Sequence, residues 1–196
     1  MNLLKAELLH QALSALAGFL EADDATPERL VVIGGSALIA LGIVSRTTRD
    51  VDILAGFDPE QGLVDPRPLS QALRTAAEKV ALELGLDSNW LNSGPADQVR
   101  AGLPEGFLSR LVRQDFGSRL TIFFPDRFDL IHLKLFAIID QGSGRHVQDL
   151  LALKPTKDEI LQSTLWVLTQ DDGEVFPQMV RQTLYELGHG DVVARI

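Results

Sequence analysis

Apolar residues recur along the chain at two spacings, which predict helices in some segments and strands in others. Over residues 2–21 they repeat every three or four positions, the pattern of an amphipathic helix. Short apolar runs at 29–33 and 51–54 have the length of buried strands. A short helix is expected between them, over 36–41. The first quarter of the chain therefore predicts a helix followed by a strand–turn–helix–strand unit.

The middle of the chain is expected to complete a sheet. Residues 56–67 hold two prolines and predict a loop, and residues 69–84 predict a helix that ends at Gly85. Residues 108–116 and 119–124 are typical of two strands joined by a tight turn, whereas the glycines and prolines within 89–107 favour irregular structure.

After Pro125 the pattern becomes helical. Thr156 and Glu159 form a capping-box pattern at the start of one of these helices. The expected helices cover 126–139, 145–153, 160–168 and 176–187. We therefore predict an α+β fold, with a mixed sheet, flanking helices and a C-terminal helical subdomain. Residues 1–125 would form the core with its N-terminal helix, and residues 126–196 the helical subdomain packing on that core.

Composition narrows the class of protein. A chain of 196 residues with 45% hydrophobic content can bury a sizeable core, and it contains no cysteine for disulfides or thiolate metal sites. It has no apolar run long enough for a membrane span, so a cytoplasmic protein is expected. The net charge of −9 argues against tracking long stretches of nucleic acid. This charge is still compatible with an enzyme that binds a nucleotide, or one RNA end, through Mg²⁺ and a few cationic side chains.

The candidate chemistry lies in the strand–turn–helix–strand unit. Asp50 and Asp52 are two residues apart in the second apolar run, so in a strand their carboxylates share one face. Paired acids at this spacing suit Mg²⁺, which uses one or two carboxylates plus substrate phosphates. The Gly34-Gly35-Ser36 turn offers backbone N–H groups at the start of a helix, where phosphate binds readily. Together these features suggest phosphoryl or nucleotidyl transfer.

Four further charged residues are candidates, each with a simpler alternative. Lys134 lies in an apolar helical segment and needs a partner if it is buried, unless its ammonium reaches the surface along its stem. Asp149 is either a site residue or the local ion-pair partner of Arg145, four residues earlier. Arg46 and Arg49 either clamp phosphates or belong to a solvated loop.

The glycine–serine turn followed by an Asp-x-Asp strand resembles the nucleotidyltransferase superfamily of the DNA polymerase β type. Further motifs look like the AbiEii-type group, which includes many bacterial minimal nucleotidyltransferases, some of them toxins of toxin–antitoxin pairs. These motifs are Arg46-Thr47-Thr48-Arg49, Trp90-Leu91-Asn92, Lys134-Leu135-Phe136-Ala137 and Arg145-His146-Val147-Gln148-Asp149-Leu150. The resemblance covers about residues 30–153.

The resemblance implies transfer of a nucleoside monophosphate from an NTP, ATP among them, to an acceptor with release of pyrophosphate. Asp50 and Asp52 would bind Mg²⁺, and the Gly34–Ser36 turn would hold the triphosphate with help from Lys134. Asp149 would also belong to the active site. Residues assigned to the nucleotide are Gly34, Gly35, Ser36, Arg46, Arg49 and Lys134.

One departure concerns the general base. Many superfamily members carry a third carboxylate on a later strand, but residues 119–124 contain no acid. Asp115, Asp126 or Asp149 could substitute, and Asp149 is the first choice because its motif matches.

Two functions of different classes remain open. The first is a Mg²⁺-dependent nucleotidyltransferase whose acceptor is an RNA or tRNA end, a protein or a small molecule, with an antitoxin-like protein as a partner. The second is a non-catalytic nucleotide-binding or partner-binding module with a degenerate nucleotidyltransferase fold.

Overall fold

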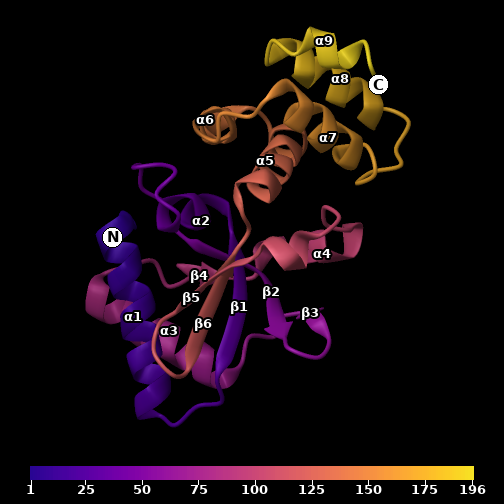
Figure 1. The fold of residues 1–196 in the computed structure, drawn as a ribbon. Helices are drawn as coiled ribbons and strands as arrows, with labels where there is room; N and C mark the ends of the chain where they lie inside the picture. The colour runs from indigo at the N-terminus through magenta and orange to yellow at the C-terminus, as the bar shows by residue number, and fades with distance from the viewer. The chain divides into compact units, whose positions relative to one another are not determined.

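A mixed six-stranded sheet with flanking helices forms the first of two units in the computed structural model, which describes residues 1–196 (Figure 1). This sheet unit comprises Met1–Arg100 and Leu108–Pro125, and the helical unit comprises Ala101–Phe107 and Asp126–Ile196. The predicted α+β fold with a mixed sheet is confirmed. None of the helices is both long enough and apolar enough to cross a membrane.

The sheet has the strand order β3-β2-β1-β6-β5, with β4 pairing to β2 outside this path. The strands are β1 (Glu28–Ile33), β2 (Val51–Asp58), β3 (Gly62–Val64), β4 (Leu91–Asn92), β5 (Val112–Asp115) and β6 (Leu120–Phe124). The β1–β6 and β2–β4 pairs are parallel and the others are antiparallel. Strands β1 and β2 carry the two apolar runs, and both lie inside the sheet with a partner strand on each edge.

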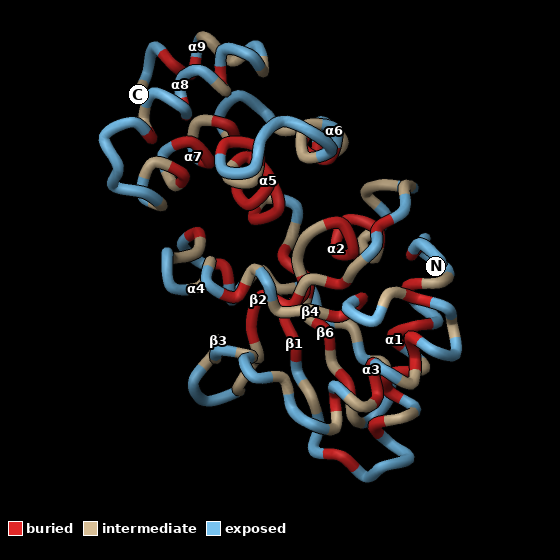
Figure 2. The backbone as a smooth tube through the Cα atoms, turned by 180° about the vertical axis from the view of Figure 1, so that it is seen from behind, coloured by how far each residue is buried: buried red, intermediate tan, exposed pale blue.

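Helices α1 (Ala6–Ala22) and α3 (Gln71–Leu84) pack on each other along one side of the sheet, as Figures 1 and 2 both show. The short α2 (Gly34–Ala40) follows β1 directly. Ser70 caps the start of α3, and Gly85 ends it in the left-handed conformation, as its glycine signal predicts. The short helical turns η1 (Gly94–Asp97) and α4 (Gln98–Ala101) lie in the segment expected to be irregular, and η2 (Phe107–Arg110) replaces the start of the strand expected over 108–116.

The helical unit is built around α5 (Arg127–Gln141), which packs against three of its neighbours. The other helices are α6 (Gly144–Ala152), α7 (Lys157–Val167), α8 (Phe176–Glu186) and α9 (Gly190–Val193). The capping box between Thr156 and Glu159 is confirmed at the start of α7.

The expected loop over 56–67 is wrong for residues 56–58 and 62–64, where β2 continues to Asp58 and forms a hairpin with β3. An acid and a glycine of this segment build the turn of the hairpin. The Asp58 carboxylate accepts the backbone N–H groups of Glu60 and Gln61 at 2.8 and 2.9 Å. Gly62 follows with φ of +78°, a conformation that glycine adopts without strain.

Candidate active site

The glycine turn joins the end of β1 to α2. Gly34 has φ of +76°, in the left-handed region where an L side chain is strained. Gly35 and Ser36 are buried, and the Ser36 hydroxyl donates to the carbonyl oxygen of Ile33 at 3.0 Å. The turn is therefore a rigid piece of backbone at the end of a central strand.

Asp52 lies against this turn. It pairs with Ile33 in the β1–β2 register. A side-chain carbon at position 34 would lie only 2.5 Å from Asp52 Oδ2, so the carboxylate occupies the space that glycine leaves open. The other carboxylate oxygen, Oδ1, accepts a hydrogen bond from the Asn92 amide at 3.2 Å.

Asp50 reaches the same turn from the residue before β2. Its Oδ1 accepts the hydroxyl of Thr48 at 3.1 Å, and Thr48 Oγ1 would lie 3.1 Å from a side-chain carbon at position 35. Val51 is fully buried, whereas both acids are only half-buried. The structure thus brings both acids to the two consecutive glycines, Asp50 through Thr48 and Asp52 directly.

Of the two predicted arginines, one lies at the turn. Arg46 is half-buried, and its Nη2 would lie 2.8 Å from a side-chain carbon at position 35. Its Nη1 donates to the carbonyl oxygen of Thr47 at 2.8 Å. Arg49 is exposed beside Asp50 in the sequence. A guanidinium fixed against a glycine backbone is suited to a phosphate placed on that backbone.

The donor set at the turn fits a hard divalent cation. Two carboxylates supply oxygen ligands, and Mg²⁺ usually takes one or two of these and completes its shell with water and phosphate oxygens. No group of three or more His, Cys, Asp or Glu side chains in the structure is arranged to hold a metal. Because Gly34 has no side chain, the Asp52 carboxylate lies directly against the turn, so an ion held by Asp52 would lie close to that backbone.

Asp115 is excluded as the substitute for the missing third carboxylate. It pairs with Thr121, which pairs in turn with Arg29 near the start of β1. The glycine turn follows Ile33, four residues further and thus about 13 Å along the strand. The Thr121 hydroxyl and then Arg113 hold the pKa of Asp115 below its usual range. Asp115 therefore lies at the opposite end of the sheet from the acid pair.

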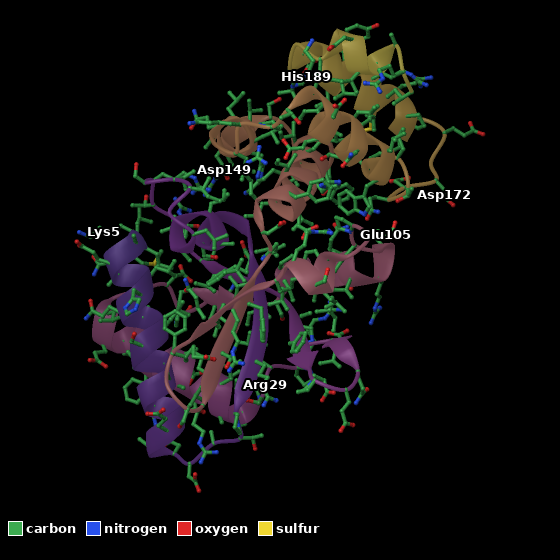
Figure 3. The ribbon with its side chains drawn as sticks, viewed as in Figure 1. Lys5, Arg29, Glu105, Asp149, Asp172 and His189 are labelled. Atoms are coloured by element: carbon green, nitrogen blue, oxygen red, sulfur yellow. The ribbon has the colours of Figure 1, made fainter.

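Lys134 and Asp149 form a buried ion pair within the helical unit. Lys134 Nζ on α5 donates to Asp149 Oδ2 on α6 at 2.8 Å, and the two residues are 5% and 0% exposed. Figure 3 shows Asp149 on α6. The alternative in which the Lys134 ammonium reaches the surface is therefore wrong. Arg145, the other partner considered for Asp149, is exposed. Because the acid pair belongs to the other unit, a shared site stays a prediction.

Asp126, the remaining base candidate, caps α5. Its Oδ1 accepts the backbone N–H of Asp129 at 2.9 Å, as expected of an N-cap aspartate. This contact explains the residue structurally without assigning it any chemistry.

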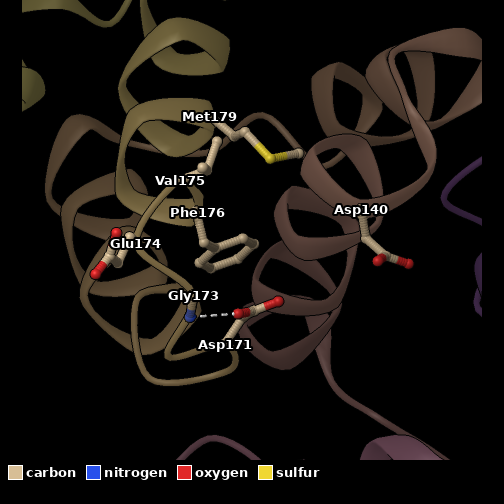
Figure 4. Close-up of a pocket in the computed structure, with 7 residues that line it drawn as sticks. All are labelled: Asp140, Asp171, Gly173, Glu174, Val175, Phe176 and Met179. Atoms are coloured by element: carbon tan, nitrogen blue, oxygen red, sulfur yellow. Dashed lines mark hydrogen bonds between the residues drawn. The ribbon is translucent and has the colours of Figure 1, made fainter.

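The helical unit also holds a cavity of about 250 Å³ (Figure 4). Its walls combine carboxylates with apolar side chains, and the Asp171 carboxylate accepts the backbone N–H of Gly173 at 2.7 Å. The lining residues are Asp140, Asp171, Gly173, Glu174, Val175, Phe176 and Met179. None of the predicted site residues lines it.

Thr48 and Asn92 were not predicted to belong to the site, although both lie in motifs that resemble the AbiEii-type group. Each donates a hydrogen bond to one member of the acid pair. Their signal in the sequence is their place: Thr48 precedes the acids by two residues, and Asn92 follows the buried Trp90.

A comparison with known protein families shows which family the chain belongs to. A family described as "Nucleotidyltransferase of unknown function" (DUF6036) matches residues 9–161. The chain belongs to this family. The matched region includes the glycine turn and the acid pair, and also Lys134 and Asp149. No curated protein and no solved structure matched the chain.

Proposed function

We propose that this member of the nucleotidyltransferase family transfers a nucleoside monophosphate from an NTP to an acceptor in a Mg²⁺-dependent reaction. The observation that carries the proposal is the close packing of Asp52 on Gly34, with Asp50 held beside Gly35 through Thr48. It places an acid pair against the glycine backbone of the turn in a chain of this family. Metal ligands and phosphate groups need this proximity in order to share one ion.

Each group at the turn has a role in this proposal. Asp50 and Asp52 would hold Mg²⁺, which when bound neutralises charge on the phosphate oxygens. Gly34 to Ser36 would receive the triphosphate on their backbone, and Arg46 would bind a phosphate oxygen there. Arg49, next to Asp50, would add a second cation.

The buried pair would supply the remaining groups. Lys134 would bind phosphate oxygens, with Asp149 fixing the direction of its ammonium. Asp149 is also our candidate for the base that accepts the proton of the attacking hydroxyl. Under that assignment Asp149→Ala slows transfer much more than it weakens NTP binding, because a base acts mainly in the transition state.

The biological setting follows from the motifs. We infer an AbiEii-like member from the Arg46–Arg49, Trp90–Asn92 and Lys134–Ala137 segments. An RNA or tRNA end, a protein or a small molecule would then be the acceptor, and an antitoxin-like protein would be the partner. The net charge of −9 favours an acceptor bound at one end over a long nucleic acid.

A second function is favoured by a specific observation. Strand β6 carries no acid, and Asp115 lies at the far end of the sheet. A chain without a base could still bind nucleotide and act as a binding module for a partner.

Transfer of an α-phosphate label distinguishes the two functions. The purified protein is incubated with Mg²⁺ and each α-³²P-labelled NTP, with total tRNA, with protein extract or alone. The enzyme places label on one acceptor class and releases unlabelled pyrophosphate, and Asp50→Asn abolishes both. Tight NTP binding without pyrophosphate release in any mixture supports the binding module instead.

A further inference from the structure

We propose that Thr48 and Asn92 are positioning residues for the acid pair, one neutral donor for each carboxylate. Thr48 Oγ1 donates to Asp50 Oδ1 at 3.1 Å, and Asn92 Nδ2 donates to Asp52 Oδ1 at 3.2 Å. The inference rests on the proposed function, because it concerns how the metal ligands are held.

Thr48 is held by the N-terminal segment. Its backbone N–H donates to the Leu4 carbonyl oxygen at 2.9 Å, and its own carbonyl oxygen accepts the Leu4 N–H at 2.8 Å. Thr48 is 3% exposed and Leu4 is completely buried. The hydroxyl therefore starts from a fixed backbone, and little conformational entropy is lost when it bonds to Asp50.

Asn92 is held by its own turn. It pairs with Asp52 in the parallel β2–β4 register, and its Oδ1 accepts the Gly94 N–H at 2.9 Å. A backbone N–H can only donate, so this bond fixes which end of the amide is oxygen. The Nδ2 donor is thereby directed at Asp52.

Strand β4 is anchored by the residue that directly precedes it. Trp90 is fully buried, and its indole N–H donates to the Ala77 carbonyl oxygen on α3 at 3.0 Å. Its carbonyl oxygen accepts the N–H of Val51, which stands between the two acids. The amide and the acid pair are thus fixed to the same backbone.

Neutral donors suit this task. Two neighbouring carboxylates repel, and a hydrogen-bond donor to each of them holds its oxygens in a fixed orientation. A hydroxyl and an amide do so without adding a positive charge that would repel the cation. Partners that orient metal-binding side chains in this way are commonly worth about 10- to 100-fold in metal affinity.

Binding of Mn²⁺ alone tests this inference without an activity assay. Mn²⁺ takes the same oxygen ligands as Mg²⁺, and its free form is counted by electron paramagnetic resonance. We expect Thr48→Val and Asn92→Ala each to weaken binding at least tenfold. Thr48→Ser should recover most of the affinity, because it restores the hydroxyl. Serine lacks the methyl group that valine keeps, so recovery by serine assigns the loss in Thr48→Val to the missing hydroxyl.

The matched control is Thr121→Val. Thr121 donates to Asp115 at 2.8 Å, the same pair of groups at the opposite end of the sheet, so its loss should leave Mn²⁺ affinity unchanged. Urea unfolding of every variant shows whether it is folded during the titration.

The outcomes separate this inference from the proposed function. If Asp50→Asn abolishes Mn²⁺ binding while Thr48→Val and Asn92→Ala bind like Thr121→Val, the positioning roles are wrong and the metal site stands. If the native protein binds no Mn²⁺, or if Asp50→Asn binds as well as the native protein, the proposed function itself fails. Equal losses for Thr48→Val and Thr48→Ser also overturn the role of the hydroxyl.

Discussion

The carboxylate of Asp52 fills the space where a side chain at position 34 would begin. Only 2.5 Å separates Oδ2 from that position, so no residue larger than glycine fits without moving the acid. Gly34 also has φ of +76°, which strains any other residue. Gly34 therefore has two roles: it adopts a positive φ, and it leaves room for the Asp52 carboxylate. Experiments can separate these two roles.

Gly34→Ala should weaken Mn²⁺ binding at least tenfold, because the new methyl group displaces Asp52. Its free energy of unfolding should fall by about 1–3 kcal/mol from backbone strain and the clash. Gly42→Ala is the matched control: Gly42 has φ of +69° but no neighbour within 4 Å of its side-chain position. It should lose stability alone. Equal Mn²⁺ affinities in the two variants would show that Asp52 is not a ligand held by this contact.

The buried pair of Lys134 and Asp149 predicts a large effect on stability. Lys134→Met leaves a buried carboxylate without its ammonium and should lower the free energy of unfolding by about 3–5 kcal/mol. The double variant Lys134→Met, Asp149→Leu removes both charges and should recover most of that loss. If Lys134 acts on phosphates, as we propose, the recovered stability comes without recovered NTP affinity.

An exposed pair of the same kind provides the control for this experiment. Lys157 Nζ lies 2.7 Å from Asp191 Oδ2, with the two side chains 75% and 49% exposed. Lys157→Met should therefore change the unfolding free energy by less than about 1 kcal/mol. A similarly small change for Lys134→Met would contradict the buried ion pair.

Glu159 predicts a dependence of stability on pH. The guanidinium of Arg127 contacts its carboxylate at 2.5 and 3.0 Å and, as the main cause, lowers its pKa from 4.5 to about 2. A lowered pKa in the folded state means that the contribution is complete above pH 4.5. It is lost as the pH falls from about 4.5 to about 2.

Glu159→Gln tests this by chemical unfolding at several pH values. At pH 6 it should cost about 1–3 kcal/mol, the usual loss of a hydrogen bond to a charged group. Its difference from the native protein should shrink steadily below pH 4.5. Glu186→Gln, on the exposed side of α8, should cost less than about 0.5 kcal/mol at every pH. A Glu159→Gln deficit that stays constant down to pH 2 would contradict the assigned cause.

Local signals in the sequence predicted much of the fold. Gly85 ends α3 and the Thr156–Glu159 box begins α7, because capping depends on neighbouring residues alone. The β2–β3 hairpin was not predicted, because its turn residues, among them Asp58 and Gly62, are also typical of loops. Pairing between strands depends on partners that are distant in the sequence.

The same limit applies to the candidate site. The spacing of Asp50 and Asp52 indicated a shared face, and the glycine turn stood out by composition. The donors Thr48 and Asn92 did not, since a hydrogen bond from residue 92 to residue 52 has no signature in spacing. Lys134 and Asp149 were recognised separately, but their contact across 15 positions was not.

The most direct test of the central claim is calorimetric titration of an NTP into the protein with Mg²⁺ and again with the metal chelated. If the acid pair and the glycine turn form one metal-dependent nucleotide site, binding appears only with Mg²⁺. Asp52→Asn should then lose at least tenfold in affinity while unfolding like the native protein. Nucleotide binding that is equally tight without metal and in Asp52→Asn would contradict the account.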